Sequence, residues 1–262
     1  MIRYLRLYAH LVRFSFSRAM EFRLDFFFRV FMDIQWYAVH LAFFAILFRE
    51  TRALGGWSWD QTIVFAASMF LMDAIQMTLF SNNTWWFPIL VNRGDLDYYL
   101  VRPVSSLFFV SLRDFAANSF LNLIIAVGIF AWALARYPEP LGAARVALFV
   151  FLLLVGVGLF YLLSMVSLIP VFWLQSRTGL REIFWSLERF GLRPHGIYHG
   201  WVRRVLVTLL PLALLCSYPQ LALYDESPLR ITLHMVAVLV GASLVVAWMW
   251  KRGLRSYSSA SS

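Results

Sequence analysis

Polar and ionisable side chains inside apolar stretches are the residues of this chain that could do chemistry. Asp73 lies near the middle of the apolar stretch 61–81, and Gln76 follows three residues later on the same helical face. An ionisable group in hydrocarbon costs several kcal/mol unless it is paired or hydrated, so such groups often line a path for ions or substrates. The alternative for each residue is an interhelical hydrogen bond that fixes packing. The candidates for a translocation pathway are Asp73, Gln76, Asp33, His40, Asn118 and Asn122.

Two segments between the apolar stretches carry charges beside many apolar side chains. In the segment 85–103, Gly94 and Asp95 indicate a turn, with Asp95 as the cap of a short helix. In the segment 175–204, apolar residues recur at 180, 183, 184 and 187, which is the spacing of an amphipathic helix. We expect both segments on the cytoplasmic side, where membrane or another protein must cover their apolar faces.

Several kinds of catalytic or metal site are disfavoured. Asp95 and Asp97 could be a metal pair, but no nucleotide-binding domain is there to present them. His195 and His199 have a spacing that suits a metal on a helix, yet the proline and glycines around them argue against a regular helix. The phosphate loop, H-E-x-x-H and G-x-S-x-G patterns are missing. We therefore expect no catalytic residue, no metal site and no ATP hydrolysis by this chain alone.

The elements that must position these residues are long apolar helices. Each stretch is near the ~20 residues that a helix needs to cross a bilayer. Five of the 23 Lys and Arg residues lie in the gaps on one side, and the other 18 lie on the side of both termini, which predicts cytoplasmic termini. The prediction is an all-α polytopic membrane protein, a single transmembrane domain over 1–262, with transmembrane helices at about 30–48, 61–81, 113–135, 145–168, 205–223 and 231–250.

Composition supports a membrane protein and argues against nucleic acid as a partner. Hydrophobic residues make up 61% and charged residues 14% of the chain, far from the ~45–50% and ~25% of soluble domains. The net charge of +9 is dispersed next to the expected spans rather than gathered on one soluble face. Anionic lipid is the expected counter-charge.

The two ends of the helical pattern have distinct features. Residues 1–29 place Arg3, Arg6 and Arg13 along one face with apolar residues on the others, which predicts an amphipathic helix in the membrane interface. Near the fifth stretch, prolines interrupt the region 211–228, so we expect a broken, partly re-entrant segment on the external side. Such backbone is tolerated at membrane depth only where protein or a water-filled cavity satisfies it.

These features together resemble an ABC-2 type ABC transporter permease, and more narrowly its small six-span branch with proposed multidrug or viologen exporters. The likeness rests on the basic leader, the six stretches, the segment 92–103 and the ending 253–260. Its most specific string is G-x-L-D-x-Y-L-x-R-P, formed by Gly94, Leu96, Asp97, Tyr99, Leu100, Arg102 and Pro103.

The resemblance implies the permease subunit of an ATP-driven exporter in the cell inner (plasma) membrane. A second permease subunit and a cytoplasmic ABC ATPase that binds ATP and Mg would complete it, with no cofactor in this chain. Two rival functions are a proton-coupled secondary transporter using Asp73 and a membrane-embedded lipid-modifying enzyme. The resemblance places the ATPase-coupling contact at Gly94, Asp95, Leu96, Asp97, Arg102, Arg181, Glu182 and Glu188.

Overall fold

The computed structural model describes residues 2–19, 23–138, 141–176, 179–191, 193–224 and 227–258. Over these residues the chain is helical and contains no β-strand beyond one isolated bridge between Leu54 and Trp57. Five helical segments are long and apolar enough to cross a membrane: Val30–Glu50, Trp59–Arg93, Ala117–Ala135, Ala143–Leu174 and Pro228–Ser256. The all-α membrane architecture is therefore confirmed.

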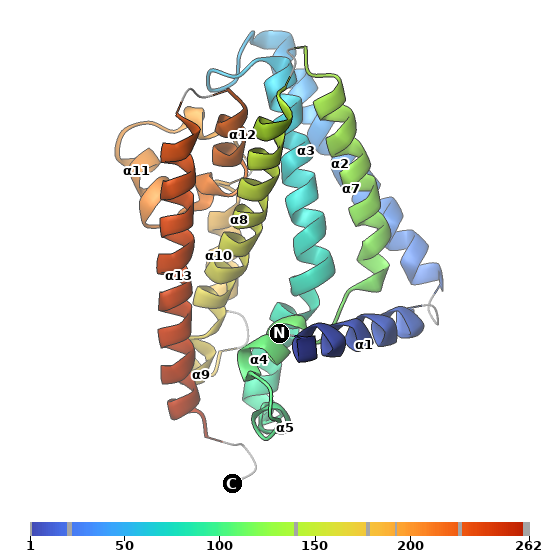
Figure 1. Cartoon of the computed structure of the whole chain (residues 1–262), viewed down its shortest axis with the longest axis vertical. Helices are drawn as coiled ribbons and strands as arrows, with labels where there is room; N and C mark the ends of the chain where they lie inside the picture. Colours follow the sequence, from blue (N-terminus) through green and yellow to red (C-terminus); the bar gives the residue numbers. More distant parts are fainter. Residues whose placement is uncertain are drawn as a thin grey trace.

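The spans are built from helices that run roughly along the long axis of the molecule (Figure 1). Helix α3 (Trp59–Gln76) begins at a capping box in which Ser58 and Gln61 bond each other's backbone N–H. It continues without a break through the π-turn η1 (Met77–Ser81) and α4 (Asn82–Arg93). The other spans are α2 (Arg23–Glu50), η2 with α7 (Ala117–Ser119 and Phe120–Ala135), α8 with α9 (Ala143–Leu168 and Val171–Leu174) and α13 (Pro228–Ser256).

Helix α3 is the centre of the bundle. It packs mainly against α7 and also against α8, and α8 packs mainly against α13. In an apolar 18-residue stretch of the span that includes α3, 67% of the residues are buried, whereas in the corresponding stretch of α2 only 11% are buried. The outer face of α2 is thus left for lipid or for another protein chain.

Helix α1 (Ile2–Ala19) lies across the other helices in the half of the molecule that holds both termini (Figure 1). The hydroxyl of Tyr4 accepts a hydrogen bond of 3.2 Å from the backbone N–H of Ser105. Ser15, which is buried, accepts one of 3.3 Å from Phe115 N–H. The expected helix over 1–29 ends ten residues earlier, at Ala19, and α2 begins at Arg23.

The third span begins later than the expected residue 113 because the backbone breaks between α6 (Ser106–Leu112) and η2. Asn83 receives a bond of 3.0 Å from Asp114 N–H and donates one of 2.8 Å to Asp114 C=O. Ala116 N–H donates to Thr78 C=O in the π-turn at 2.9 Å. Side chains and the π-turn therefore supply the partners that an unbroken helix would have supplied.

The expected fifth span at 205–223 is not one helix. The chain forms α11 (Gly200–Thr208), the short η4 (Leu212–Leu214) and α12 (Ser217–Tyr224), with Pro211 between the first two. Proline lacks the backbone N–H that would continue a helix. The predicted broken segment is present, but the described residues contain five span-length helices rather than the expected six.

The expectation that the whole segment 175–204 lies at the terminal end is wrong. Helix α10 (Gly179–Glu188) packs along α8, with the rings of Phe160 and Phe184 5.7 Å apart. The following turn η3 (His195–Ile197) packs on the loop between α2 and α3, where the rings of Trp57 and His195 are 5.6 Å apart. The bundle therefore covers the side of α10 that carries Phe184, while Ile183 of the apolar stripe stays 55% exposed. The segment runs toward the end opposite the termini, here called the distal end.

Candidate functional site

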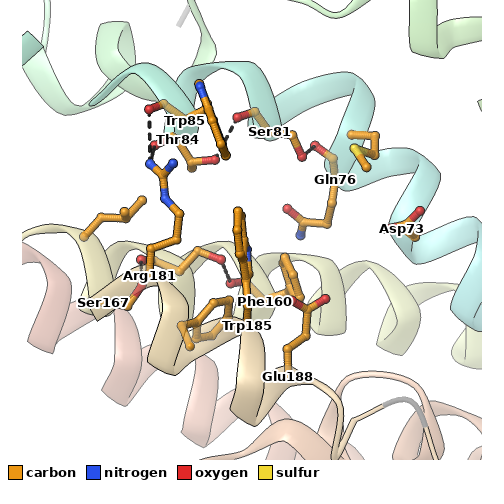
Figure 2. Close-up of a pocket in the computed structure, with 14 residues that line it drawn as sticks. Asp73, Gln76, Ser81, Thr84, Trp85, Phe160, Ser167, Arg181, Trp185 and Glu188 are labelled. Carbon is orange, nitrogen blue, oxygen red and sulfur yellow. Dashed lines mark hydrogen bonds between the residues drawn. The ribbon is translucent and has the colours of Figure 1, made fainter. Parts of the chain in front are cut away.

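A cavity of about 350 Å³ lies between the central helix, α8 and α10 (Figure 2). It brings together segments that are up to 115 residues apart in the chain, from residue 73 to residue 188. Its walls combine carboxylates, hydroxyls, an amide, one guanidinium and aromatic rings, so it is polar enough to hold water or a polar ligand. The lining residues are Asp73, Gln76, Met77, Ser81, Thr84, Trp85, Phe160, Ser164, Ser167, Leu168, Arg181, Phe184, Trp185 and Glu188.

Charges of opposite sign occupy opposite ends of this cavity. Figure 2 shows Arg181 at one end and Asp73 and Glu188 at the other. Burial raises the pKa of Glu188 to about 7, and the nearby Asp73 carboxylate adds to the shift. Two carboxyl groups in one cavity favour the binding of a proton or another cation there.

The π-turn η1 shapes the wall that the central helix contributes. At this turn Ser81 Oγ donates to Gln76 C=O, five residues earlier, at 3.2 Å. Gln76 is buried and donates from Nε2 to Val157 C=O of α8 at 2.6 Å. Single π-turns within α-helices occur frequently at functional sites. Here the turn lies within the cavity wall, because Thr84 and Trp85 of α4 line the cavity as well, and α4 continues toward α5 (Asp97–Leu100).

Arg181 has a structural task that follows from Pro88. Because Pro88 has no N–H, the carbonyl of Thr84 loses its normal helical partner four residues later. Arg181 donates to Thr84 C=O at 2.9 Å and to Trp85 C=O at 3.1 Å. Its guanidinium also lies 4.6 Å from the Trp85 ring centroid and 5.8 Å from that of Trp185. Arg181 therefore fastens α10 to the proline site of α4.

Of the six predicted pathway residues, Asp73 and Gln76 share this cavity. Asn122 is buried elsewhere and accepts a 2.6 Å hydrogen bond from Tyr37, so it joins α7 to α2. Asn118 and Asp33 are half-buried and do not line the cavity. His40 lies in a different groove, between α2 and the end of α10.

The predicted coupling residues fall into two separate groups. Gly94 ends α4 in a left-handed conformation (φ 79°), and Asp95, Leu96, Asp97 and Arg102 follow it at the terminal end. Arg181, Glu182 and Glu188 lie instead on α10, beside the spans, where Arg181 and Glu188 face the cavity and Glu182 is exposed. The two expected contact regions therefore do not form one continuous surface.

The segment after Gly94 exposes apolar side chains next to a residue that is anchored in the core. Leu96 is fully buried in a cluster with Phe87, Phe172 and Trp250. By contrast, Tyr98 is 70% and Val101 is 83% exposed. Exposed apolar residues gathered on an ordered turn indicate a contact with another protein or with membrane.

The C-terminal part of α13 reaches the same region. Trp173 Nε1 donates to Ser256 Oγ at 2.9 Å, and the rings of Phe172 and Tyr257 are 6.0 Å apart. Burial, together with the Asp97 carboxylate, raises the pKa of Tyr257 to about 12. Tyr257, just after α13, thus lies beside Asp97 of α5.

The sequence analysis missed the hydroxyl and aromatic lining of the cavity. Ser164 and Ser167 interrupt a very apolar stretch at a spacing of three, which is a signal that could have been used. Trp85 and Trp185, stacked 6.0 Å apart, have no such signal because they are distant in the sequence. Within the described ranges, no group of three or more His, Cys, Asp or Glu residues could hold a metal ion.

Comparison with known proteins gives one result. The sequence model of the family described as ABC-2 family transporter protein matches residues 34–261. The search of curated proteins and the search of solved structures found no match.

Proposed function

Because this chain belongs to the ABC-2 family of transporter proteins, we propose that it is the membrane-spanning subunit of an ATP-driven exporter whose ATP is hydrolysed by a separate subunit. The family and the five candidate spans make it a multi-pass membrane protein and a permease of an ABC transporter. ATP and Mg would bind to the ATPase. The chain would lie in the cell inner (plasma) membrane with both termini in the cytoplasm.

The observation that carries this proposal is the exposed apolar turn at the terminal end. Tyr98 and Val101 project from a turn whose neighbour Leu96 is anchored in the bundle, so a force on the turn is transmitted to α4. Water is a poor environment for these two side chains, and a protein surface would cover them. We assign that surface to the cytoplasmic ATPase, with Asp95, Asp97 and Arg102 at its polar rim.

Coupling would pass from this turn to the cavity through α4. Arg181 bonds the proline site of α4 to α10, and at the other end of α10 the Glu188 carboxyl lines the cavity together with Asp73. Movement of α4 on ATP binding would therefore change the position of α10 and the access to Asp73 and Gln76. This is a two-state switch whose balance depends on the ATPase.

A second permease subunit, identical or related, would pack on the outer face of α2. That face carries the exposed side chains of Phe31, Ile34 and Ile46. In a monomer they face lipid, whereas in a dimer they would form part of the interface. Lipid contact and dimer contact are equally compatible with apolar side chains, so the mass of the purified complex decides between them.

The test is affinity purification of the tagged chain from its native membrane in mild detergent, followed by mass spectrometry. We expect a phosphate-loop ATPase in stoichiometric amount with the wild type. Val101→Asp places a charge on the proposed contact and should remove the ATPase. Ala53→Asp is the matched control, because Ala53 is exposed in the loop at the distal end.

Loss of the ATPase with Val101→Asp and its retention with Ala53→Asp would support the assignment. Retention with both variants would show that the turn is not the contact. If the intact wild-type complex contains no ATPase at all, the exporter proposal fails. The proton-coupled transporter with Asp73 as its ion site would then be the function to examine.

A further inference from the structure

A second groove, whose charged lining residues are two arginines, lies between α2 and the end of α10. Its volume is about 350 Å³, and its lining residues are Val39, His40, Phe43, Phe44, Arg189 and Arg193. Arg189 directly follows Glu188, which lines the acidic cavity. Consecutive residues at this end of α10 thus serve two different sites.

The groove has positive charge without a matching negative charge. Arg189 and Arg193 are both exposed, and the six lining residues include no carboxylate. His40 uses its Nδ1 in a 2.9 Å hydrogen bond with Trp36 C=O, so only Nε2 is left for a ligand. Two guanidiniums that converge on one groove form a binding site for an anionic oxygen group such as phosphate.

The position of the groove along the span is unusual for arginine. His40 lies ten residues from each end of the candidate span Val30–Glu50, which places it halfway along. Charged residues at that depth need water, an ion or a ligand as a partner. Val39 is 65% and Phe43 is 49% exposed, so apolar surface continues from the charged groups along α2.

We propose that this groove binds an anionic phospholipid, with its phosphate held by Arg189 and Arg193 near His40. Its acyl chains lie along Val39 and Phe43 of α2, which line the groove. The negative charge of the lipid phosphate pairs with the two guanidiniums, and the acyl chains cover exposed apolar side chains of α2. On the proposed export function, such a head group held halfway across the bilayer would be cargo on its path, and this last step depends on that function.

The test is native mass spectrometry of the full-length chain released from nanodiscs of phosphatidylcholine and phosphatidylglycerol. The quantity measured is the ratio of retained phosphatidylglycerol to retained phosphatidylcholine. The double substitution Arg189→Gln and Arg193→Gln should lower this ratio about thirtyfold, because each arginine near the lipid phosphate contributes on the order of 1 kcal/mol. Arg252→Gln with Arg255→Gln is the control, because both residues are exposed at the end of α13 and the loss of charge is equal.

Two further measurements separate the sources of the anion. Phe43→Ala should weaken retention of phosphatidylglycerol without removing it, since it shortens the apolar track but keeps both arginines. Inorganic phosphate at millimolar concentration should not displace the lipid. Displacement by phosphate alone would overturn the lipid assignment in favour of a free anion.

The remaining outcomes also decide the proposal. An unchanged lipid ratio in the double variant would overturn it. If the double variant forms less dimer but retains the same amount of phosphatidylglycerol, the groove is instead a contact with a second copy of the chain. If the double variant does not fold, Arg193→Gln and the charge-preserving pair Arg189→Lys and Arg193→Lys replace it, with loss expected for the first and retention for the second. ATP and the ATPase are absent from this assay, so its failure leaves the exporter proposal standing.

Discussion

The distal and terminal ends of the molecule are completed in different ways. At the distal end the chain closes on itself, because Gly196 meets the backbone of Gly55 and His195 is only 6% exposed between Trp57 and Tyr218. At the terminal end the turn after Gly94 leaves apolar side chains in the open, with Val101 83% exposed. The distal end is therefore held by close backbone packing, whereas the terminal end exposes an apolar surface to which a partner could bind.

This difference teaches where stability and assembly reside. Changes at the distal end should lower the free energy of unfolding, because no partner is needed to complete its contacts. Changes to the exposed turn should leave folding intact and affect only what binds there. Each of the following substitutions tests this division, from the largest expected effect on stability to the smallest.

Gly196→Ala should have the largest effect. A Cβ at residue 196 would collide with the carbonyl group of Gly55, which is backbone and cannot rotate away. We expect a loss of about 3 kcal/mol in unfolding free energy, measured by thermal unfolding in detergent. Gly128→Ala is the control, since a Cβ there meets nothing within 4 Å. Equal stability of the two variants would contradict the close packing of the distal end.

Arg181→Ala should cost about 2 kcal/mol, because it leaves the Thr84 carbonyl at the proline site unpartnered and removes the contact with Trp85. Arg252→Ala is a matched control, since Arg252 also lies over a tryptophan ring, that of Trp248, but is exposed. The comparison uses thermal unfolding of both variants in the same detergent. A cost for Arg252→Ala as large as that for Arg181→Ala would show that the proline site is not what makes Arg181 important.

His195 should make stability depend on pH. Burial lowers its pKa to about 4, and the positive charge of Arg203 adds to this shift. The unfolded chain, with a histidine pKa near 6.5, therefore binds more protons than the folded chain between about pH 6.5 and pH 4. Stability is present above this window and is lost as the pH falls through it, by about 2 kcal/mol at pH 5.

The measurement is the difference in melting temperature between pH 7.5 and pH 5. His195→Gln should reduce this difference, because glutamine does not titrate. A pH dependence that is identical in the variant would assign the effect to other groups and would remove His195 from the account of the distal end.

The sequence predicted the spans better than their relations in space. Hydropathy located the stretches around Asp73 and around the C-terminal helix because a bilayer imposes a simple length and composition on each crossing. The π-turn and the continuation of the central helix to Arg93 were not predicted. Both depend on partners distant in the sequence, such as Asp114 and Ala116, which pair with Asn83 and Thr78.

The segment 175–204 shows why the charge rule failed locally. Its arginines and its amphipathic spacing predicted a surface helix at the terminal end. The structure uses Arg181 to satisfy a carbonyl freed by Pro88, and Glu188 lines a cavity. A charge count along the chain cannot distinguish an arginine in water from one that is buried and bonded to backbone carbonyls.

Val101→Ser should have the smallest effect on stability, less than about 0.5 kcal/mol, because the side chain is already in solvent. Leu96→Ala, five residues earlier in the same segment, is the positive control and should cost about 2–3 kcal/mol, because Leu96 is fully buried beside Phe87 and Trp250. The decisive readout is the pair of measurements, thermal unfolding and ATPase copurification, made on the same samples. Val101→Ser should leave the melting temperature unchanged and reduce the amount of copurified ATPase. A side chain that contacts only a partner contributes to binding and not to the stability of the isolated chain. If Val101→Ser instead lowers the melting temperature as much as Leu96→Ala does, the turn belongs to the fold of the chain, and the contrast between its two ends disappears.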